Sequence, residues 1–583
     1  MRFLRLLTNS LIAGALGAAY LTILLLQLNP QVPLFSRAVW SWYATLCAFY
    51  GVHFAITFYV VMVLREFISL DVFSPGWISV RLLAWLSAAA AAAAALLMWL
   101  NLSGLRLVFD EASARRMTVG AAATTASAIV LFGIAVAHYS SRRRGSRVGA
   151  ALLAIAIVGS LALPLAARGR GGTAPLDARR VTIAPSPAAS EGPRVAMILL
   201  DGASLEYIWP RAVEGRLPNF GRLLDRGASM DLATIRPTQP DPVWAAVATG
   251  MYPAKNGVRS DAQYFARGTR VPVDVLPDHL FAHTLVRLGV IRAESASSAA
   301  WSARPLWAIL GDYGIRSGVV RWPLTYPAEP IQGFLVTDRF HELFGSILEL
   351  DGRVVSPPDV QPLVHDAFAG TDAPAEDDVQ RAGWPIVTPS APDLATPRWD
   401  WFYSRAMQVL KKARPVRFTA IRYRGLDTMG HRYLRYAEPR AFGDVSDAER
   451  ERYGAVLDRY YTAIDGEIGG AIDALAPGDL LLVVSGFGMQ PVQPVKHWLG
   501  RLLREPDLSG THERAPDGFL LAYGSAVAAG RRQRGAVVDV APTVLYYLGI
   551  PVGRDMDGYA RADLFTATFT AERPITFIPS HGK

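Results

Sequence analysis

The feature that most constrains the fold of this chain is a set of long apolar stretches in its first third. They lie at about 7–28, 39–64, 80–101, 119–139 and 148–166. A membrane-spanning helix needs roughly 20 largely apolar residues, and each stretch is long enough. A soluble Ala-rich helix is the alternative for the third stretch, but its flanks are apolar too. A signal peptide is the alternative for the first, but that stretch is long and four more follow. We therefore expect an all-α transmembrane region of about five helices over residues 1–166.

Arginines near the ends of these stretches predict the orientation. With a cytoplasmic N-terminus, the arginines on the cytoplasmic side are Arg2, Arg5, Arg65, Arg81, Arg142, Arg143, Arg144 and Arg147. Those on the other side are Arg106, Arg115, Arg116, Arg168, Arg170, Arg179 and Arg180. The short loop SRRRGSR at 141–147 is the densest basic segment, so it receives most weight. We expect the N-terminus inside and the C-terminal domain in the periplasm or outside the cell.

The net charge of +9 is carried mainly by arginine, much of it in loops and a linker near apolar segments. This pattern favours a membrane and its phospholipids as partners. Nucleic acid is not expected, because no basic stripe with interleaved aromatic residues is present. The single cysteine, Cys47, excludes an intrachain disulfide. Residues 167–193 are rich in Gly, Pro, Ala and Arg and are expected to form a linker.

From Arg194 onward, short apolar strands alternate with amphipathic helices. The predicted strands are VAMILL (195–200), SGVVRW (317–322), GFLVTD (333–338), VRFTAIRY (416–423), DLLLVVSG (479–486) and GFLLAYG (518–524). Fully apolar strands with helices between them indicate an α/β fold with a parallel sheet covered on both faces. Ligands of such sheets bind beyond the carboxyl ends of the strands.

Several residues that could bind a metal follow these strands. Asp201 ends the first strand, Asp427 and His431 stand in GLDTMGH, and His512 stands in SGTHERAPDGF. Two imidazoles and a carboxylate form a typical zinc set with one open position. By spacing alone the pattern is weak, because a scattered Asp or His is more often a cap, a turn residue or a surface group.

The stretch RPTQPDPVWAAVATG (236–250) has the pattern of a turn that opens a helix. Asp241 is expected to cap this helix and Pro242 to lie in its first turn. Such a turn is a common place for a nucleophile. The residue just before the expected cap is Pro240.

A series of longer motifs resembles the alkaline phosphatase superfamily, and most closely its branch of type I phosphodiesterases, nucleotide pyrophosphatases and predicted phosphohydrolases. The motifs are VAMILLDG, GRLPNF, a P-T-x(5)-W turn, ATGMYPAKNG, ARPLWAIL, RWPLTYPAEPIQGFLVTDRF, GLDTMGH, GTHERAPDG and VAPTVLYYLGIPVGRDMDG. They occur in the family's order between about 194 and 560. The resemblance implies a mostly parallel sheet sandwiched by helices. It places an ectodomain at 194–565, with a cap insertion at about 259–400 and a tail at 566–583.

The resemblance also implies a metal chemistry. Family members use two divalent metals, usually zinc, of which one activates a Ser or Thr nucleophile and the other helps to hold the phosphate. Asp427, His431 and His512 match the ligands of the second metal. Asp201 matches one ligand of the nucleophile's metal and stays a candidate ligand.

The rest of the nucleophile's half-site is missing. The nucleophile position falls on Pro240, which has no hydroxyl, and an Asp-His ligand pair falls on Gly486 and Phe487, which cannot ligate a cation. Phe487 is expected to fill the emptied space, and Asp201 to remain as a helix or turn cap. Thr238 and Asp241 could substitute for the nucleophile, but displacement along the turn and a capping role argue against them.

Three functions are consistent with these residues. The first is a degenerate, membrane-anchored phosphodiesterase-like protein, a pseudoenzyme with one zinc that binds a phosphorylated lipid or envelope component, or a partner. The second is a one-metal, zinc-dependent phosphoester hydrolase that uses a metal-bound water. The third is a lipid-linked phosphoryl-group transferase, which needs the missing nucleophile as well. In the cap insertion, His279, His283 and Arg304 are interpreted as ordinary packing or surface residues.

Overall fold

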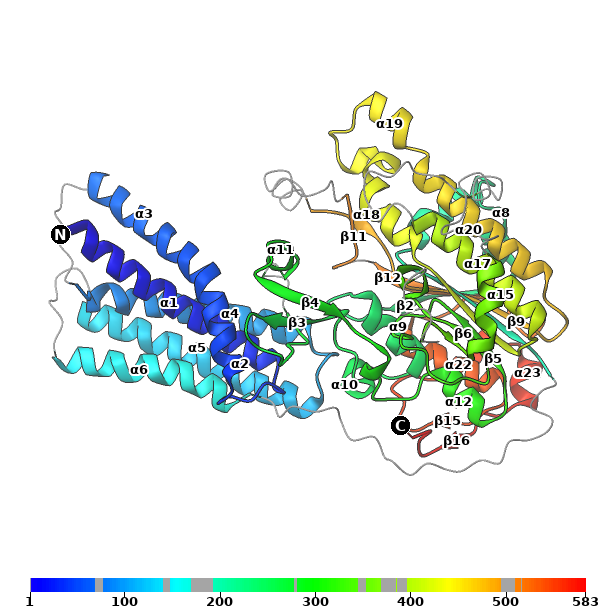
Figure 1. Ribbon diagram of the computed structural model, residues 1–583, viewed down its shortest axis with the longest axis horizontal. Helices are drawn as coiled ribbons and strands as arrows, with labels where there is room; N and C mark the ends of the chain where they lie inside the picture. Colours follow the sequence, from blue (N-terminus) through cyan, green and yellow to red (C-terminus); the bar gives the residue numbers. More distant parts are fainter. Residues whose placement is uncertain are drawn as a thin grey trace. The chain divides into compact units, whose positions relative to one another are not determined.

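The computed structural model describes residues 2–68, 77–139, 147–168, 192–276, 280, 282–343, 353–367, 384, 396–493, 509–514 and 516–582. The chain forms two compact units (Figure 1). The first, called here the helical unit, consists of Met1–Ala174 and Ala262–Ser295. The second, the α/β unit, consists of Pro175–Asp261 and Ala296–Lys583.

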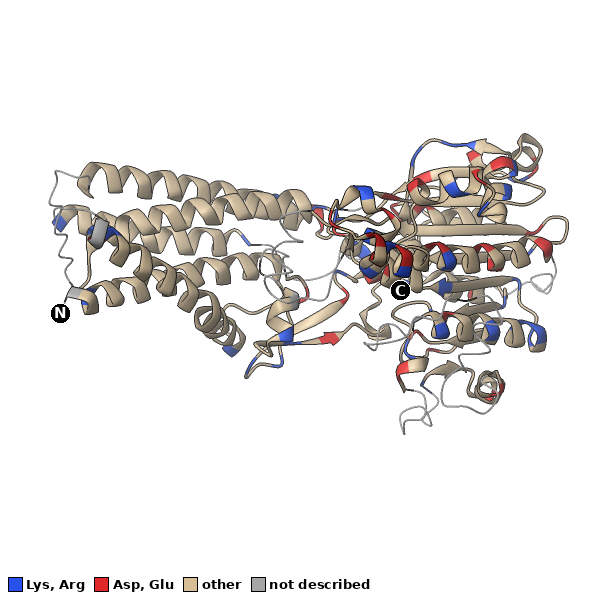
Figure 2. Ribbon diagram, turned by 90° about the horizontal axis from the view of Figure 1, so that it is seen from above, with Lys and Arg blue, Asp and Glu red and all other residues tan. Residues whose placement is uncertain are grey.

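Five helical segments of the helical unit are long and apolar enough to cross a membrane, which confirms the predicted number among the described residues. They are α1 (Arg2–Leu28), α2 (Arg37–Leu46) continued through the π-helical turn Cys47–Gly51 into α3 (Val52–Ile68), α4 (Val80–Gly104), α5 (Glu111–Tyr139) and α6 (Arg147–Ala166). Figure 2 shows that charged residues are almost absent along these helices. The loop at 140–146 lies outside the described residues.

The alanine run of α4 packs inside this unit. Ala84, Ala88 and Ala91 are buried together with Ala128 and Leu131 of α5. Small side chains let two helix backbones approach closely, which is how helices associate in a membrane where burial from water provides no driving force. The run therefore suits a spanning helix better than a soluble one.

The α/β unit is built on a ten-stranded sheet with the order β13-β2-β12-β9-β1-β8-β5-β6-β7, in which β14 also pairs with β2. The strands are β1 (Val195–Leu200), β2 (Ala228–Ala233), β5 (Ser317–Val320), β6 (Gly333–Val336), β7 (Val355–Ser356), β8 (Phe418–Tyr423), β9 (Leu480–Phe487), β12 (Asp517–Tyr523), β13 (Gly530–Arg531) and β14 (Gly535–Ala536). The central run β9-β1-β8-β5-β6 is parallel, whereas β12 is antiparallel to both of its neighbours. All six predicted strands are present, and the α/β fold class is confirmed.

Helices cover both faces of this sheet. Along β1, Val195, Met197 and Leu199 belong to one apolar core, and Ile198 and Leu200 to another. This alternation is the strand period of two. The first core contains residues of α9 (Pro240–Thr249), α12 (Leu306–Asp312) and α22 (Val540–Tyr547). The second contains residues of α7 (Leu205–Val213), α8 (Pro218–Arg226), α17 (Thr396–Ala413), α18 (Gly425–Ala437) and α20 (Val456–Asp473).

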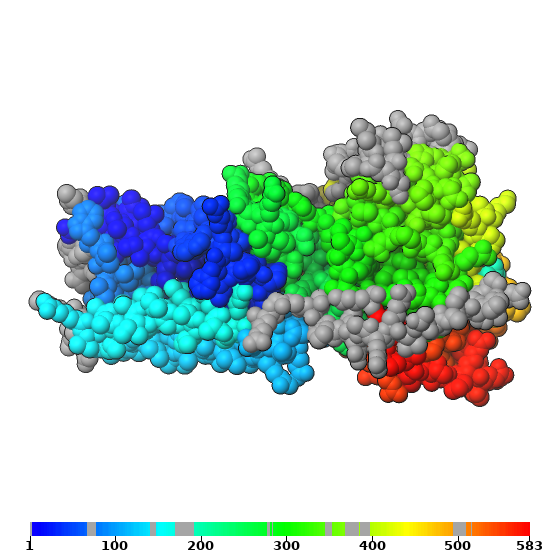
Figure 3. All heavy atoms as spheres, turned by 60° about the horizontal axis from the view of Figure 1, so that its bottom comes forward, coloured from blue at the N-terminus to red at the C-terminus, as the bar shows by residue number. Residues whose placement is uncertain are grey.

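A hairpin from the middle of the sequence belongs to the helical unit, although the sequence placed it in the cap insertion at about 259–400. It contains β3 (Ala262–Ala266), α11 (Ala282–Arg287) and β4 (Ile291–Ser295). Its apolar residues share one core with α1 and α2. On the surface in Figure 3, green atoms lie against the blue atoms of the N-terminal helices. Asn29 holds it: the Asn29 side chain accepts bonds of 2.9 Å from the backbone N–H groups of Asp274 and Val275, and donates one of 2.7 Å to the Val275 carbonyl. His279 and the side chain of His283 lie outside the described residues.

The C-terminal segment is also integrated, although the sequence suggested a tail at 566–583. Phe569 of α23 (Ala567–Glu572) packs against the core of the α/β unit. β16 (Phe577–Ile578) pairs in parallel with β15 (Val552–Gly553). Most of the predicted linker, residues 169–191, lies outside the described residues.

Candidate metal centre and an occupied half-site

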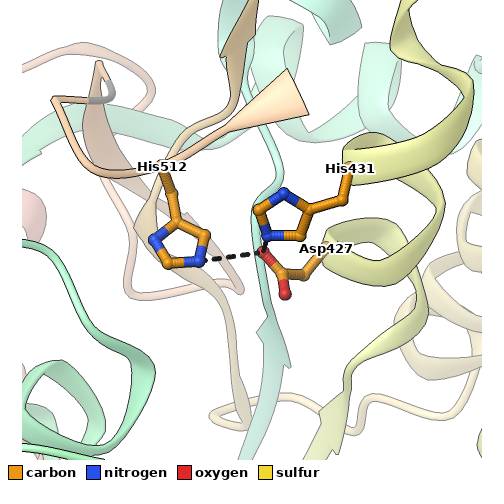
Figure 4. Close-up of side chains that lie close together, drawn as sticks. All are labelled: Asp427, His431 and His512. Carbon is orange, nitrogen blue, oxygen red and sulfur yellow. Dashed lines mark ion pairs between the residues drawn. The ribbon is translucent and has the colours of Figure 1, made fainter. Parts of the chain in front are cut away.

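Asp427, His431 and His512 lie together beyond the carboxyl ends of the parallel strands. Asp427 and His431 are on α18, which begins directly after β8, and His512 follows the short strand β11 (Gly510–Thr511). One ligand atom from each residue lies within 4.8 Å of the other two. Figure 4 shows both imidazoles facing the Asp427 carboxylate; the two Nε2 atoms lie 3.5 Å and 3.7 Å from Asp427 Oδ1.

Backbone carbonyls fix the tautomer of both histidines. His431 Nδ1 lies 2.8 Å from the carbonyl oxygen of Gly510, and His512 Nδ1 lies 3.1 Å from that of Thr238. A carbonyl can only accept, so each Nδ1 carries the proton. Each Nε2 is then left with a free lone pair, the arrangement that metal-bound histidines show.

These residues fit a divalent metal. Asp427 is buried, and its Oδ1 has no hydrogen-bond partner among the described residues. Such an orphaned oxygen is costly unless a ligand satisfies it. The spacing also agrees, since tetrahedral ligands at about 2.0–2.1 Å from zinc lie about 3.4 Å apart. Burial raises the pKa of Asp427, but His431, His512, Arg424 and Arg422 together outweigh burial, so that this pKa lies below its usual value.

Close packing around α18 positions the set. The Asp400 carboxylate accepts a bond of 2.9 Å from the N–H of Gly425 at the start of α18, and Asp400 is itself paired with Arg321. At the other side, Gly510 lies against the helix: a Cβ there would be 2.4 Å from the carbonyl oxygen of Gly430. Only glycine permits this approach, which brings the Gly510 carbonyl to His431.

Asp201 is not part of this cluster. Its fully buried carboxylate accepts three bonds from the Arg422 guanidinium, at 2.5, 2.9 and 3.0 Å, and one of 2.7 Å from the indole N–H of Trp244. Burial lowers the pKa of Arg422, but Asp201 more than compensates and raises it. Asp201 is therefore neither a helix cap nor an open ligand; a guanidinium neutralises it where a metal would otherwise be expected.

Apolar atoms surround the two other positions, 486 and 487, at which the family resemblance implied metal ligands. Phe487 is fully buried, and its ring centroid lies 5.0 Å from that of His512. A Cβ at Gly486 would lie 2.4 Å from Cγ1 of Val243. Phe487 thus packs beside His512, and Val243 takes the space that a side chain at 486 needs.

The turn before α9 lies against the candidate centre, because the Thr238 carbonyl contacts His512. The helix begins two residues earlier than expected: Gln239 is the N-cap and Pro240 occupies the first helical position, where its missing N–H costs nothing. Asp241 is therefore not the cap. Its N–H donates to Asp261 Oδ1 at 2.8 Å. The Thr238 hydroxyl is buried without a hydrogen-bond partner among the described residues.

Two carboxyl groups near this turn, those of Asp241 and Asp261, have raised pKa values. Burial, reinforced by Asp261, raises the pKa of Asp241 well above its usual value. Burial also raises the pKa of Asp261, to about 6. His512 and Arg422 lower the pKa of Asp261 and so limit this rise, which places both carboxylates in the electrostatic field of the site.

Two arginines of β8 and its end carry roles that the sequence did not reveal. Arg422 was part of a predicted strand, and the available signal was an Arg in an otherwise apolar central strand, which needs a buried partner. Arg424 follows at the N-cap of α18; its side chain is exposed and has no ion-pair partner among the described residues. Arg304, by contrast, pairs with Asp312, an ordinary structural contact.

The sequence model of the type I phosphodiesterase / nucleotide pyrophosphatase family matches residues 195–547. Among solved structures, the chain is similar to murine ectonucleotide pyrophosphatase / phosphodiesterase 5, at 13% identity and a TM-score of 0.37, over 64% of this chain and 100% of that one. It is similarly related to an inactive form of that protein in complex with AMP, at 12% identity, the same TM-score and the same coverage. No curated protein matches the chain.

Proposed function

The chain belongs to the type I phosphodiesterase / nucleotide pyrophosphatase family, and we propose that it is a degenerate member that binds a phosphorylated ligand without turning it over. In this proposal the five apolar helices anchor it in a membrane. One zinc ion binds Asp427, His431 and His512, and the ligand is a phosphorylated component of the envelope.

The observation that carries this proposal is the Arg422–Asp201 pair. Three guanidinium bonds and the Trp244 N–H use the lone pairs of the Asp201 carboxylate. A cation at this place would meet the positive charge of Arg422. The half-site that would activate a nucleophile is therefore closed by the protein itself, and Pro240 offers no hydroxyl for it to activate.

Ligand binding is supported by the half-site that stays open. When bound, a divalent ion supplies a Lewis acid that attracts phosphate oxygens. Arg424 stands three residues before Asp427, exposed and without an ion-pair partner among the described residues, and it helps to lower the pKa of Asp427. Guanidinium groups match phosphate geometry well. The metal ion held by Asp427, His431 and His512, together with the Arg424 guanidinium, would suit a phosphate monoester or diester as ligand.

A second candidate function is a one-metal hydrolase. The observation in its favour is the pair Asp241 and Asp261, joined by the bond from the Asp241 N–H to the Asp261 carboxylate, in the electrostatic field of His512. In this function Asp261 accepts a proton from an attacking water. The pKa of Asp261, at about 6, is close to that of a useful general base. In this function a water molecule attacks the phosphate in place of a protein nucleophile.

One experiment separates the two functions. The full-length protein in detergent with zinc is given bis(4-nitrophenyl) phosphate, and both calorimetric binding and steady-state release of nitrophenol are measured. The variants are His512→Ala and, as a matched histidine control far from the set in sequence and contacts, His581→Ala, whose imidazole bonds the Pro551 carbonyl.

We expect zinc-dependent binding that His512→Ala abolishes and His581→Ala keeps, with nitrophenol release no faster than that of His512→Ala. Turnover that disappears in His512→Ala would replace the binding proposal by the one-metal hydrolase. Absence of any zinc-dependent binding would contradict both functions.

A further inference from the structure

The hairpin of the helical unit lies at the ends of its spanning helices. Leu25 and Leu26, one turn from the end of α1, share a buried core with Ala266 and Ile291 of the hairpin. A helix end is where a spanning segment leaves the hydrocarbon layer. Phe35 and Trp40, at the start of the next segment, are largely exposed. Aromatic residues are enriched at that level of a membrane, so the hairpin belongs to the lipid–water interface.

The hairpin carries a shallow hollow on its own surface. Its lining includes Phe265, Arg267, Thr269, Val286, Ile291 and Arg292. Phe265 and Ile291 are nearly buried and form an apolar floor. The Arg292 guanidinium stands over the Phe265 ring, 5.2 Å from its centroid. The hollow thus combines apolar surface with two guanidinium groups.

The positive charge at this hollow is only partly neutralised. Arg292 pairs with Glu294 at 3.0 Å, with both side chains more than half exposed, so water weakens the pair. Arg267 donates to the Gly289 carbonyl at 3.1 Å and has no ion pair among the described residues. Arg270 is exposed, and the described part of the chain provides no acidic partner for it either. The hollow therefore carries net positive charge.

We propose that this hollow binds the head group of an anionic phospholipid from the membrane that the helices span. The phosphate takes bonds from Arg267 and Arg292, and the glycerol and upper acyl carbons lie against the apolar floor and the exposed Leu288. A soluble anion would use only the guanidinium groups. The lipid uses both kinds of surface, and it is present at the level where the hairpin lies. This site is separate from the Asp427–His431–His512 set and does not depend on the function proposed there.

Lipid titration followed by native mass spectrometry tests the proposal. Full-length, delipidated protein is titrated with phosphatidylglycerol and, separately, with phosphatidylcholine. The double variant Arg267→Gln/Arg292→Gln removes the two guanidinium groups. Arg115→Gln is the matched control, because Arg115 is an exposed arginine of the same unit that pairs with Glu111. A further arm adds soluble glycerol phosphate as competitor.

We expect the unmodified protein to bind phosphatidylglycerol more tightly than phosphatidylcholine. The double variant should lose roughly thirtyfold in affinity for phosphatidylglycerol, since each basic residue near an anionic surface contributes about fivefold. Arg115→Gln should stay within about twofold of the unmodified protein. The proposal would be overturned if Arg115→Gln lost as much affinity for phosphatidylglycerol as the double variant, or if the protein bound the two lipids equally well. Complete displacement of phosphatidylglycerol by glycerol phosphate would overturn it as well.

Discussion

Asp201 follows β1 at the position where the family resemblance implied a metal ligand. Its carboxylate accepts hydrogen bonds from the guanidinium of Arg422 and the indole of Trp244. A buried ion pair is weak evidence for stability, because desolvation of two charges offsets their attraction. Removal of one partner is costly, however, since the other charge stays buried and unpaired.

A double-mutant cycle on this pair tests that view. Arg422→Met should destabilise the α/β unit by about 3–5 kcal/mol. Asp201→Asn/Arg422→Met should recover much of this loss, because no buried charge remains. The readout is the unfolding midpoint by tryptophan fluorescence in detergent. Arg531→Met is the control: Arg531 pairs with Asp231 and the two side chains are 73% and 38% exposed, so about 0–1 kcal/mol is expected. Equal effects of Arg422→Met and Arg531→Met would refute the role of the buried pair.

The sequence could predict the set Asp427, His431 and His512, but it could not predict the contact between Arg422 and Asp201. Asp427, His431 and His512 each lie in a motif through which the family resemblance assigns them to the same metal ion. The structure brings the three residues together. Arg422 stands in no motif, and its partner depends on how β8 lies beside β1 in the sheet. The contact between Arg422 and Asp201 could therefore be seen only once the strands were placed.

At the scale of elements, the hairpin Ala262–Ser295 departs most from the sequence prediction. Its apolar residues show that something is buried, but a pattern does not say against what. The six strands and five spans were predictable because each is defined by its own apolar run. The hairpin's partners α1 and α2 lie more than 200 residues earlier in the chain, and buried Asn29 gives no local sign of the contact.

This contact predicts how a truncated chain behaves. A protein starting at residue 192 would expose Val273, Leu276, Leu285 and their neighbours to water, and should aggregate. Replacement of residues 263–294 by Asn-Gly should restore a monodisperse protein, because Ala262 and Ser295 are paired neighbours that a two-residue turn can join. Size-exclusion chromatography compares the truncated protein that keeps the native hairpin with the one that carries Asn-Gly. If both were equally monodisperse, the contact between the hairpin and α1 and α2 would be dispensable.

At the scale of the whole molecule, an odd number of membrane crossings, such as the five that the apolar helices are long enough to make, would put the two ends of the helical region on opposite sides of a membrane. Within the helical unit, the Gln27 side chain near the end of α1 donates a hydrogen bond of 2.8 Å to the carbonyl of Pro164 near the end of α6. This contact is expected if the two helix ends lie on the same side of the membrane. The dense arginines at 142–147 would then lie opposite the C-terminal domain. We expect that domain outside the cytoplasm.

A topology reporter provides the check. A fusion after Lys583 should be active only if the reporter works outside the cytoplasm, and a fusion in the 141–147 loop only if it works inside. Charge reversal of Arg142, Arg143 and Arg144 to Glu should weaken this bias, since positively charged loops set the orientation. A C-terminal reporter that is active only in the cytoplasm would reverse the assignment.

In the proposed function one metal half-site is open and the other is closed by Arg422, and the metal content of the protein measures this most directly. The full-length protein, equilibrated with zinc and desalted, should contain about one zinc per chain by elemental mass spectrometry, because the described residues offer one three-ligand set. His512→Ala should lower this value toward zero, and His581→Ala should leave it at one. Two tightly held zinc ions per unmodified chain would contradict the account, since the second could bind only if Asp201 were released from Arg422.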